Sequence, residues 1–429
     1  MLQAMVNAFK LPDLRRRLLF TIFILIVFRF VASIPIPGVD AEKLAQLFKG
    51  NQFLSLLDLF AGGSMSRLSI AMMGVYPYIT ATIIFQLLTP IIPKLEEWQK
   101  EGEAGRRRLN QLQHWFTIPL ALLQAMAQIS AYAGQGIITN WGFDALSNTL
   151  STIAILATVT TGTIICIWFG ELITEAGIGN GVSIIILANI VSRLPYQIGT
   201  TLIVGQNWLG ILVFFALAIV TVVAIVVVQE GERRIPVQYA KRVRGRRVYG
   251  GGSVHVPIKV LTAGMIPLIF ALSILAFPEL IGSYMQYAGG LAGDVGKALM
   301  SWFGRDSWVY WLSYFLMTVG FTFFYTMVIF ENQNLAENLQ KQGGFIPGIR
   351  PGRPTQDYLT RVLNRVTMAG SVFLGLVAVL PYFARLLTGV QTMSLESTSV
   401  LIVVGVVLDT MRQLEAQLLM RHYEGFIKE

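Results

Sequence analysis

The stretch WLGILVFFALAIVTVVAIVVV, residues 208–228, contains no charged side chain in 21 positions. A helix of about 20 mostly apolar residues is long enough to cross the hydrocarbon core of a bilayer. The next stretch, GERRIPVQYAKRVRGRRVYGG (231–251), holds seven Lys or Arg residues and a single Glu. An apolar segment of membrane length followed by a basic loop is typical of a membrane-spanning helix that ends on the cytoplasmic side.

The composition of the whole chain indicates a membrane protein. Hydrophobic residues make up 54% of the 429 residues and charged residues 13%, whereas a soluble domain carries roughly 25% charged residues. The one cysteine, Cys166, lies inside an apolar run, and the three histidines, His114, His255 and His422, are far apart in the sequence. We therefore predict no disulfide framework, no metal site and no cofactor.

Nine further segments have the length and apolar character of a spanning helix, so the sequence predicts ten spans. Of the 33 Lys and Arg residues, 25 then fall on the side of the amino terminus and 7 on the opposite side. This excess predicts that both termini are cytoplasmic. The predicted spans are residues 18–35, 69–90, 115–134, 150–170, 182–200, 208–228, 257–278, 309–330, 366–386 and 396–411.

A Gly-x-x-Pro pattern recurs at corresponding places five spans apart. It occurs in the second span as GVYPYI (74–79) and in the seventh as GMIPLI (264–269). Inverted repeats mark many membrane conduits, so we predict two pseudo-symmetric inverted halves of five helices, residues 1–204 and 205–429. Either the two breaks line a cavity between the halves, or they are ordinary kinks in two helices.

Two stretches outside the spans have a pattern of their own. FLSLLDLFAGGSMSRLS (53–69) has helical apolar spacing but is too short and too interrupted to cross. A half-helix inside a cavity and a helix on the outer surface both fit it. The edges of the basic loop, RRIPVQYA (233–240) and VYGGGSVHVPI (248–258), alternate polar and apolar residues, which predicts a hairpin-like finger. Its charges either set topology and contact anionic lipids, or dock a large acidic partner.

Residues for catalysis or ion coupling are not apparent in the predicted spans. Arg29 lies near the outer end of the first span, while Glu171, Glu279 and Asp409 lie near span ends. We see no pair of carboxylates and no carboxylate–histidine relay, whereas ion-coupled transporters usually place ionisable residues near the middle of the membrane. The sequence thus favours a passive conduit with cytoplasmic docking loops over a secondary transporter of a small solute, and it does not indicate an enzyme.

Several longer motifs resemble those of the SecY family, the channel-forming subunits of the bacterial Sec protein translocase. The similarity runs from about Leu11 to Phe426, nearly the whole chain. The motifs are SIPIPGVD (33–40), GGSMSRLSI with GVYPYITATIIFQLL (62–88), EGEAGRRR (101–108), TGTIICIWFGELITEAGIGNGVSIII (161–186), RRIPVQYAKRVRGRRVYGG (233–251), AENLQKQGGFIPGIRPGRPT (336–355) and LDTMRQLEAQLLMRHYEGF (408–426).

The resemblance implies an all-α polytopic membrane protein whose ten helices enclose an hourglass pore. Unfolded secretory polypeptides would pass through this pore, and membrane-protein segments would leave by a lateral gate between spans 2–3 and 7–8. The broken half-helix 56–66 would be a plug, with Leu56, Leu57, Phe60, Gly62, Gly63 and Met65. A narrow pore ring would be formed by six β-branched residues, Val75, Ile79, Val182, Ile186, Ile266 and Ile402.

The resemblance also implies partners and a location in the inner (plasma) membrane. The loops 229–259 and 331–365 would bind the motor ATPase SecA or the ribosome, which would drive transport by a chain that is not itself an enzyme. The docking residues would be Arg246, Arg247, Arg350 and Arg353. SecE and SecG would complete a heterotrimer, and signal sequences, nascent polypeptides and membrane lipids would be further partners.

The chain departs from the family's usual pattern at three places. The family usually has Gln-Tyr-Thr-Arg-Tyr at the start of span three, where this chain has QLQHW (111–115) and lacks the Arg. An Asn common before the Gly-x-x-Pro of span seven is Leu261, and a Pro after span eight is Gln333. These changes affect the polarity of the gate and the shape of a loop.

Overall fold

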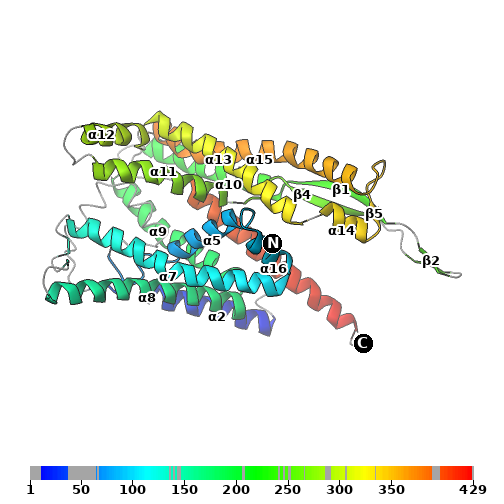
Figure 1. Ribbon diagram of the computed structural model, residues 1–429, viewed down its shortest axis with the longest axis horizontal. Helices are drawn as coiled ribbons and strands as arrows, with labels where there is room; N and C mark the ends of the chain where they lie inside the picture. The colour runs from blue at the N-terminus through cyan, green and yellow to red at the C-terminus, as the bar shows by residue number, and fades with distance from the viewer. Residues whose placement is uncertain are drawn as a thin grey trace. The chain divides into compact units, whose positions relative to one another are not determined.

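The computed structural model describes residues 11–36, 64, 67–134, 137–138, 141–142, 146–204, 208–239, 242–244, 247–249, 253–264, 266–285, 291–304, 307–333, 335–388 and 397–427. The described chain is predominantly helical (Figure 1). It forms two compact units, which we call unit one (Met1–Gly199 with Val406–Glu429) and unit two (Thr200–Gly405). The two halves inferred from the sequence, with their boundary after residue 204, stay a prediction.

Unit one is built from apolar helices, and prolines begin several of them. Proline lies in the first turn of α2, α5 and α6, where its missing N–H and its fixed φ suit a helix start. Helix α7 packs against both α5 and α8, and α2 packs against α8. The helices are α2 (Pro12–Val31), α5 (Tyr76–Leu88), α6 (Pro93–Lys100), α7 (Glu103–Gly134), α8 (Leu146–Ala176), most of α9 (Gly181–Val204) and the last part of α16 (Ser397–Ile427).

Unit two combines long helices with a small sheet. Helix α13 packs against α11 and α15, and α15 also packs against α10. The helices are α10 (Trp208–Glu230), α11 (Ile266–Met285), α12 (Leu291–Phe303), α13 (Trp308–Gln333), α14 (Leu335–Lys341), α15 (Arg353–Thr388) and the first part of α16. The strands are β1 (Glu232–Tyr239), β2 (Arg242–Arg244), β3 (Arg247–Tyr249), β4 (Ser253–Lys259) and β5 (Gly344–Phe345).

Each of the ten predicted spans overlaps one helix, α2, α5, α7, α8, α9, α10, α11, α13, α15 or α16. Within the described residues, four helices are long and apolar enough to cross a membrane, and a fifth crossing results if the bent pair α5–α6 is one span. The four are Glu103–Gly134, Ser147–Ala176, Trp308–Lys341 and Arg353–Ala384. The described residues therefore include the long apolar helices of a membrane protein. Ten membrane crossings are consistent with these helices.

The predicted hairpin is confirmed, and it corrects the start of the seventh span. Strand β1 pairs with β4 in antiparallel register, with Ile235 opposite Val256. Residues 257–259, predicted to be helical, belong to this strand, and helix α11 begins only at Ile266 and runs to Met285. Hydropathy alone does not distinguish a buried strand end from a helix start, whereas the positive φ of Gly264 (60°) marks the break before the helix.

In unit one, the backbone at Ile70 lies close to helix α8, and this contact gives a prediction about stability. A Cβ on Gly162 of α8 would lie 2.0 Å from the carbonyl oxygen of Ile70. We expect Gly162→Ala to lower the free energy of unfolding by ~1–3 kcal/mol, the usual cost of overpacking. Gly320→Ala in α13 is the matched control, because a Cβ there meets nothing within 4 Å. Thermal unfolding in detergent measures both, and equal melting temperatures for the two variants would contradict the close approach.

Candidate functional site

The two Gly-x-x-Pro patterns form matching helix starts. Gly74 and Gly264 both adopt the left-handed conformation, with φ of 52° and 60°. In each case the helix begins two residues later, α5 at Tyr76 and α11 at Ile266, with proline as its second residue. The alternative of two ordinary helix kinks is therefore wrong. The internal repeat read from the sequence has a structural counterpart at these two places.

The six predicted ring residues lie at or near helix starts or inside apolar helices. In unit one, Val75 is the residue before α5 and is 1% exposed. Ile79 lies one turn further and its N–H donates to the carbonyl of Val75. Val182 and Ile186 occupy the first two turns of α9. In unit two, Ile266 begins α11 and Ile402, which is 1% exposed, lies in the first part of α16. Their joint role as a ring stays a prediction.

The segment after the predicted plug is anchored in unit one. The plug residues Leu56, Leu57, Phe60, Gly62, Gly63 and Met65 lie outside the described residues. Beyond them, the N–H of Ile36 donates to the carbonyl of Leu68 at 2.8 Å, and Leu68 is fully buried. It packs in one hydrophobic cluster with Met72, Met73 and residues of α7 and α8. The segment that directly follows the predicted plug is therefore anchored in the core of unit one.

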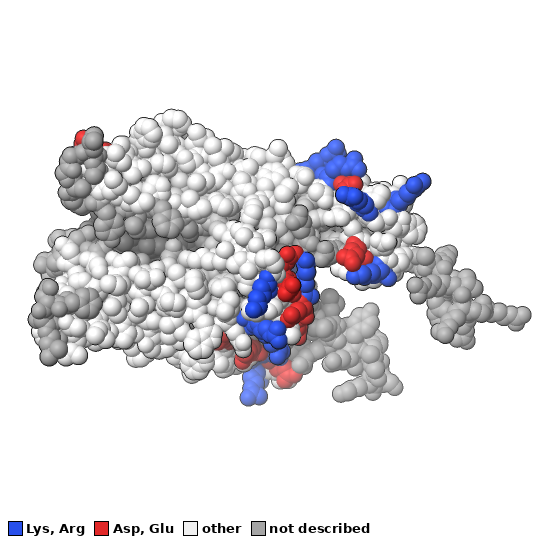
Figure 2. Space-filling view, viewed as in Figure 1, with Lys and Arg blue, Asp and Glu red and all other residues white. Residues whose placement is uncertain are grey.

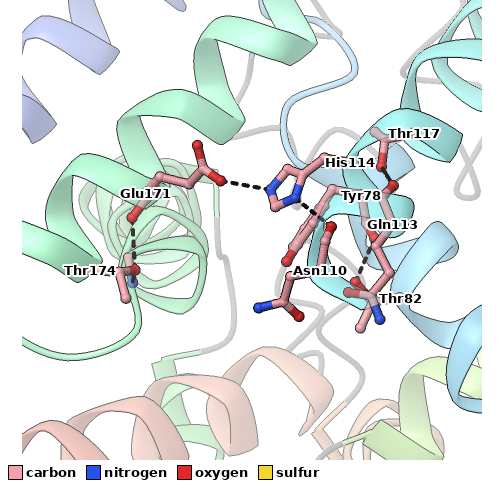
Figure 3. A network of polar contacts seen from close by, with 10 residues as sticks. Tyr78, Thr82, Asn110, Gln113, His114, Thr117, Glu171 and Thr174 are labelled. Carbon is pink, nitrogen blue, oxygen red and sulfur yellow. Dashed lines mark hydrogen bonds and ion pairs between the residues drawn. The ribbon is translucent and has the colours of Figure 1, made fainter. Parts of the chain in front are cut away.

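A polar network joins three helices of unit one (Figure 3). Nε2 of His114 in α7 lies 2.9 Å from a carboxylate oxygen of Glu171 in α8. Nδ1 of His114 lies 2.7 Å from the carbonyl oxygen of Asn110. The imidazole packs on the ring of Tyr78 in α5, with 5.1 Å between the centroids. This contact between a histidine and a carboxylate was not predicted from the sequence, because packing of α7 on α8 joins residues far apart in the chain.

This network positions helices and does not amount to a catalytic site. The side chains of His114 and Glu171 are 30% and 49% exposed, and exposed pairs of this kind contribute only ~0–1 kcal/mol. His114 is the fourth residue of QLQHW, at the place where the usual motif of span three has Arg, and in this chain it contacts Glu171. Within the residues that the structure describes, no cluster of His, Cys, Asp and Glu could hold a metal ion.

The small sheet of unit two is joined to two helices by a hydrophobic core. The sheet has the strand order β4-β1-β5. Apolar residues of alternate positions on β1 face α14 and the start of α15, so the finger is held at its base. The buried residues of this cluster are Ile235, Val237, Ile258, Leu339, Ile346, Leu359 and Leu363.

The loop between β5 and α15 presents Arg350, and Arg353 begins α15; both are predicted docking residues. Arg350 and Arg353 are both exposed. The hydroxyl of Thr355 donates to the carbonyl of Arg350 at 2.8 Å, and the N–H of Thr355 donates to the carbonyl of Gly352. The loop backbone is therefore fixed, while the guanidinium groups are free to meet a partner surface. Figure 2 shows Lys and Arg side chains gathered beside this sheet and α14.

The other two predicted docking residues are less fully described. Arg247 begins strand β3, which pairs with β2 in a second, two-stranded sheet. Arg246 lies outside the described residues. The assignment of the four arginines to docking stays a prediction. In unit one, a region of mixed charge that includes Lys100 and Arg108 lies near the turn from α6 to α7 (Figure 2).

The comparisons with known proteins decide the family. The SecY family model matches residues 69–411 of this chain. The chain belongs to the SecY family. The protein translocase subunit SecY of Thermotoga maritima is 44% identical over 438 residues, covering 100% of this chain and 98% of that protein. The subunit SecY of Mycobacterium tuberculosis is 41% identical over 448 residues, covering both chains completely.

Solved structures of SecY-like channels share the fold. One, described as a protein conducting channel, matches 94% of this chain and 92% of its own with a TM-score of 0.60 at 17% identity. Another, Sec61 in a canine ribosome–channel complex, covers the same shares with a TM-score of 0.58 at 17% identity. These likenesses confirm the all-α SecY fold expected from the sequence.

Proposed function

We propose that this chain is the channel subunit of a protein translocase, which passes unfolded polypeptides across a membrane and releases membrane segments sideways. The observation that carries the proposal is full-length similarity, at 41–44% identity, to proteins named protein translocase subunit SecY. The matching helix starts at Gly74 and Gly264 support it, because they place apolar residues at breaks that can line a pore. The alternative, a secondary transporter of a small solute, has no support in these relatives.

The apolar character of the six ring residues fits a channel that stays closed to ions. A polypeptide channel has to admit side chains of every kind when open and hold back ions at rest. A narrow apolar constriction resists wetting, whereas a polar lining solvates ions. The plug 56–66 is proposed to close the same constriction from outside.

Transport is proposed to be driven by partners that dock on the cytoplasmic side. The exposed Arg350 on the fixed loop and the exposed Arg353 at the start of α15 support this, since arginine forks bind carboxylates and phosphates in two-point contacts. The proposed partners are SecA and the ribosome, with SecE and SecG as further subunits of the channel. One structural neighbour is described as bound to the yeast 80S ribosome.

The proposed location is the inner membrane, with both termini in the cytoplasm. The excess of Lys and Arg on one side of the predicted spans supports this orientation. With this orientation, the sheet of unit two and the α6–α7 turn would both be cytoplasmic, where SecA is proposed to dock.

Reconstitution into vesicles tests the proposed function. The purified chain, with any small helical subunits that accompany it, is combined with SecA, ATP and an unfolded secretory precursor. We expect protease-protected precursor only when both channel and SecA are present, and none for a precursor without its signal sequence. Accumulation of labelled sugars or amino acids in the same vesicles, without protection of the precursor, would instead establish a solute transporter.

A further inference from the structure

The ring of His114 lies between two oxygen atoms that accept hydrogen bonds and do not donate them. Its Nδ1 is 2.7 Å from the carbonyl oxygen of Asn110, and its Nε2 is 2.9 Å from a carboxylate oxygen of Glu171 (Figure 3). A neutral imidazole carries one N–H, whereas the charged imidazolium carries two. In the neutral ring, one nitrogen would turn its lone pair toward an oxygen. The charged form of His114 is therefore the one that donates to both oxygens at once.

This contact lies where three helices of unit one meet. The hydrogen-bonded pair joins α7 to α8, and the imidazole also packs on the ring of Tyr78 in α5. Helix α7 packs against both α5 and α8 along its length. Helices α5 and α7 are the second and third predicted spans, which form one side of the predicted lateral gate. The charge of His114 thus acts at the place where α8 supports the two gate helices.

Glu171 is the carboxylate placed against the ring among the described groups around it. Helix α5 presents the uncharged Tyr78, and α8 also carries Glu175, an exposed residue one turn beyond Glu171. The charged side chains of α6 and of the first turns of α7 make other ion pairs, Lys100 with Glu96 and Arg108 with Glu101. Histidine is the side chain whose charge ordinarily changes between pH 5 and 8. The contact between α7 and α8 therefore depends on a proton in that range.

We propose that His114, in its charged form, is a positioning residue that holds α7 against α8, and that loss of its proton loosens this contact and eases opening of the lateral gate. The gate would then admit poor signal sequences more readily as the pH rises. The part that concerns the gate rests on the proposed function. The part that concerns the contact between the two helices does not.

The sign of the pH dependence follows from the form that makes the contact. The charged ring donates to both oxygens, so its stabilising effect is complete at the acidic end of the range and is lost as the pH rises and the ring gives up its proton. Since the side chains of His114 and Glu171 are 30% and 49% exposed, solvent screens their attraction. A pair of this kind shifts an equilibrium between two states by a factor of about two to five.

Thermal unfolding of the purified complex in detergent tests the contact. The wild type is compared with His114→Arg, which is charged at every pH, and with His114→Phe, which keeps a ring against Tyr78 but has no donor. We expect similar melting temperatures for the wild type and His114→Arg at about pH 6, and a lower one for the wild type at about pH 8.5. His114→Phe is expected to differ from His114→Arg by the same amount at both pH values.

Translocation in vesicles tests the effect on the gate. With SecA and ATP present, protease protection is measured for a precursor with a defective signal sequence and for the same precursor with an intact one. Their ratio cancels any effect of pH on the motor. We expect this ratio to rise about two- to fivefold between the two pH values in the wild type and to stay constant in His114→Arg.

The partner residue provides a second test with a matched control. Glu171→Gln offers both a donor and an acceptor, so the amide can pair with a neutral ring. We expect the ratio to be independent of pH in this variant. Glu175→Gln removes an exposed carboxylate from the same helix and is expected to keep the pH dependence of the wild type. The unfolding curve of each variant shows whether it is folded.

Three results would overturn the proposal. Equal changes of melting temperature with pH in the wild type and His114→Arg would show that the charge of the ring does not hold the helices. A full pH dependence in Glu171→Gln would assign it to another group. A ratio independent of pH in the wild type would show that the contact serves stability alone. Because unfolding needs neither precursor nor SecA, failure of the contact leaves the proposed translocation untouched, and failure of translocation leaves the unfolding result standing.

Discussion

The Arg350→Glu variant is expected to lose SecA-driven translocation while still inserting into the membrane and folding. Arg350 is exposed on the loop between β5 and α15, whose backbone is fixed by Thr355. A charge reversal there places a carboxylate against the acidic surface that the basic loop would bind. Removing one partner of a buried charge pair costs ~2 kcal/mol or more, which corresponds to a roughly 30-fold loss of affinity.

A matched variant separates a specific contact from a general loss of positive charge. Arg107→Glu makes the same reversal at an exposed position near the start of α7, outside the loops 229–259 and 331–365. We expect it to weaken SecA binding far less, since exposed charges away from a contact are screened by salt. Binding is measured with labelled SecA on vesicles, and translocation by protease protection of a precursor. Unchanged transport in Arg350→Glu, or equal losses in both variants, would remove Arg350 from the docking residues.

The sequence predicted those features that depend on local pattern. The hairpin followed from alternation of apolar and polar residues around Pro236 and Pro257, and β1 and β4 pair accordingly. The two Gly-x-x-Pro breaks were marked by a glycine and a proline three residues apart, and in the structure Gly74 and Gly264 adopt the left-handed conformation just before a new helix. Each of these two sequence patterns spans only a few neighbouring residues. The local structure that it predicts therefore does not depend on how distant segments pack.

Features that depend on packing of distant segments were not predicted. His114 and Glu171 come together only because α7 packs against α8, and nothing in either local sequence marks the other as its partner. Strand β5 is two residues long and exists because β1 offers it an edge. Helix α12 lies outside the predicted spans, since its 13 residues are too short to cross a bilayer.

Asparagine at Ile266 and Ile402 is expected to make the channel leak ions at rest and accept poor signal sequences. Ile402 is 1% exposed and Ile266 is half-buried, and each lies in an apolar helix segment. An amide in such a place lacks partners unless water enters, and leaving it unsatisfied costs ~1–3 kcal/mol. Hydration of the constriction recovers this energy, so the substitution favours the open state.

The size of the effect follows from the shift in a closed–open equilibrium. A bias of ~1–3 kcal/mol toward the open state changes the ratio of states by a factor of roughly 5 to 150. Planar bilayer recordings measure the resting conductance, and secretion of precursors with defective signal sequences measures the stringency. We expect both to rise in Ile402→Asn and Ile266→Asn, and to rise further in the double variant.

Two controls confine this effect to the proposed ring. Ile402→Leu keeps an apolar side chain of the same volume, and it is expected to leave conductance near the wild-type level because a dry constriction needs only apolar atoms. Val407→Asn introduces the same amide on the same helix at a position that is 44% exposed, where the amide can stay outside a constriction. Wild-type conductance and stringency in both ring variants, or an equal leak in Val407→Asn, would show that these β-branched residues serve packing and do not seal a pore.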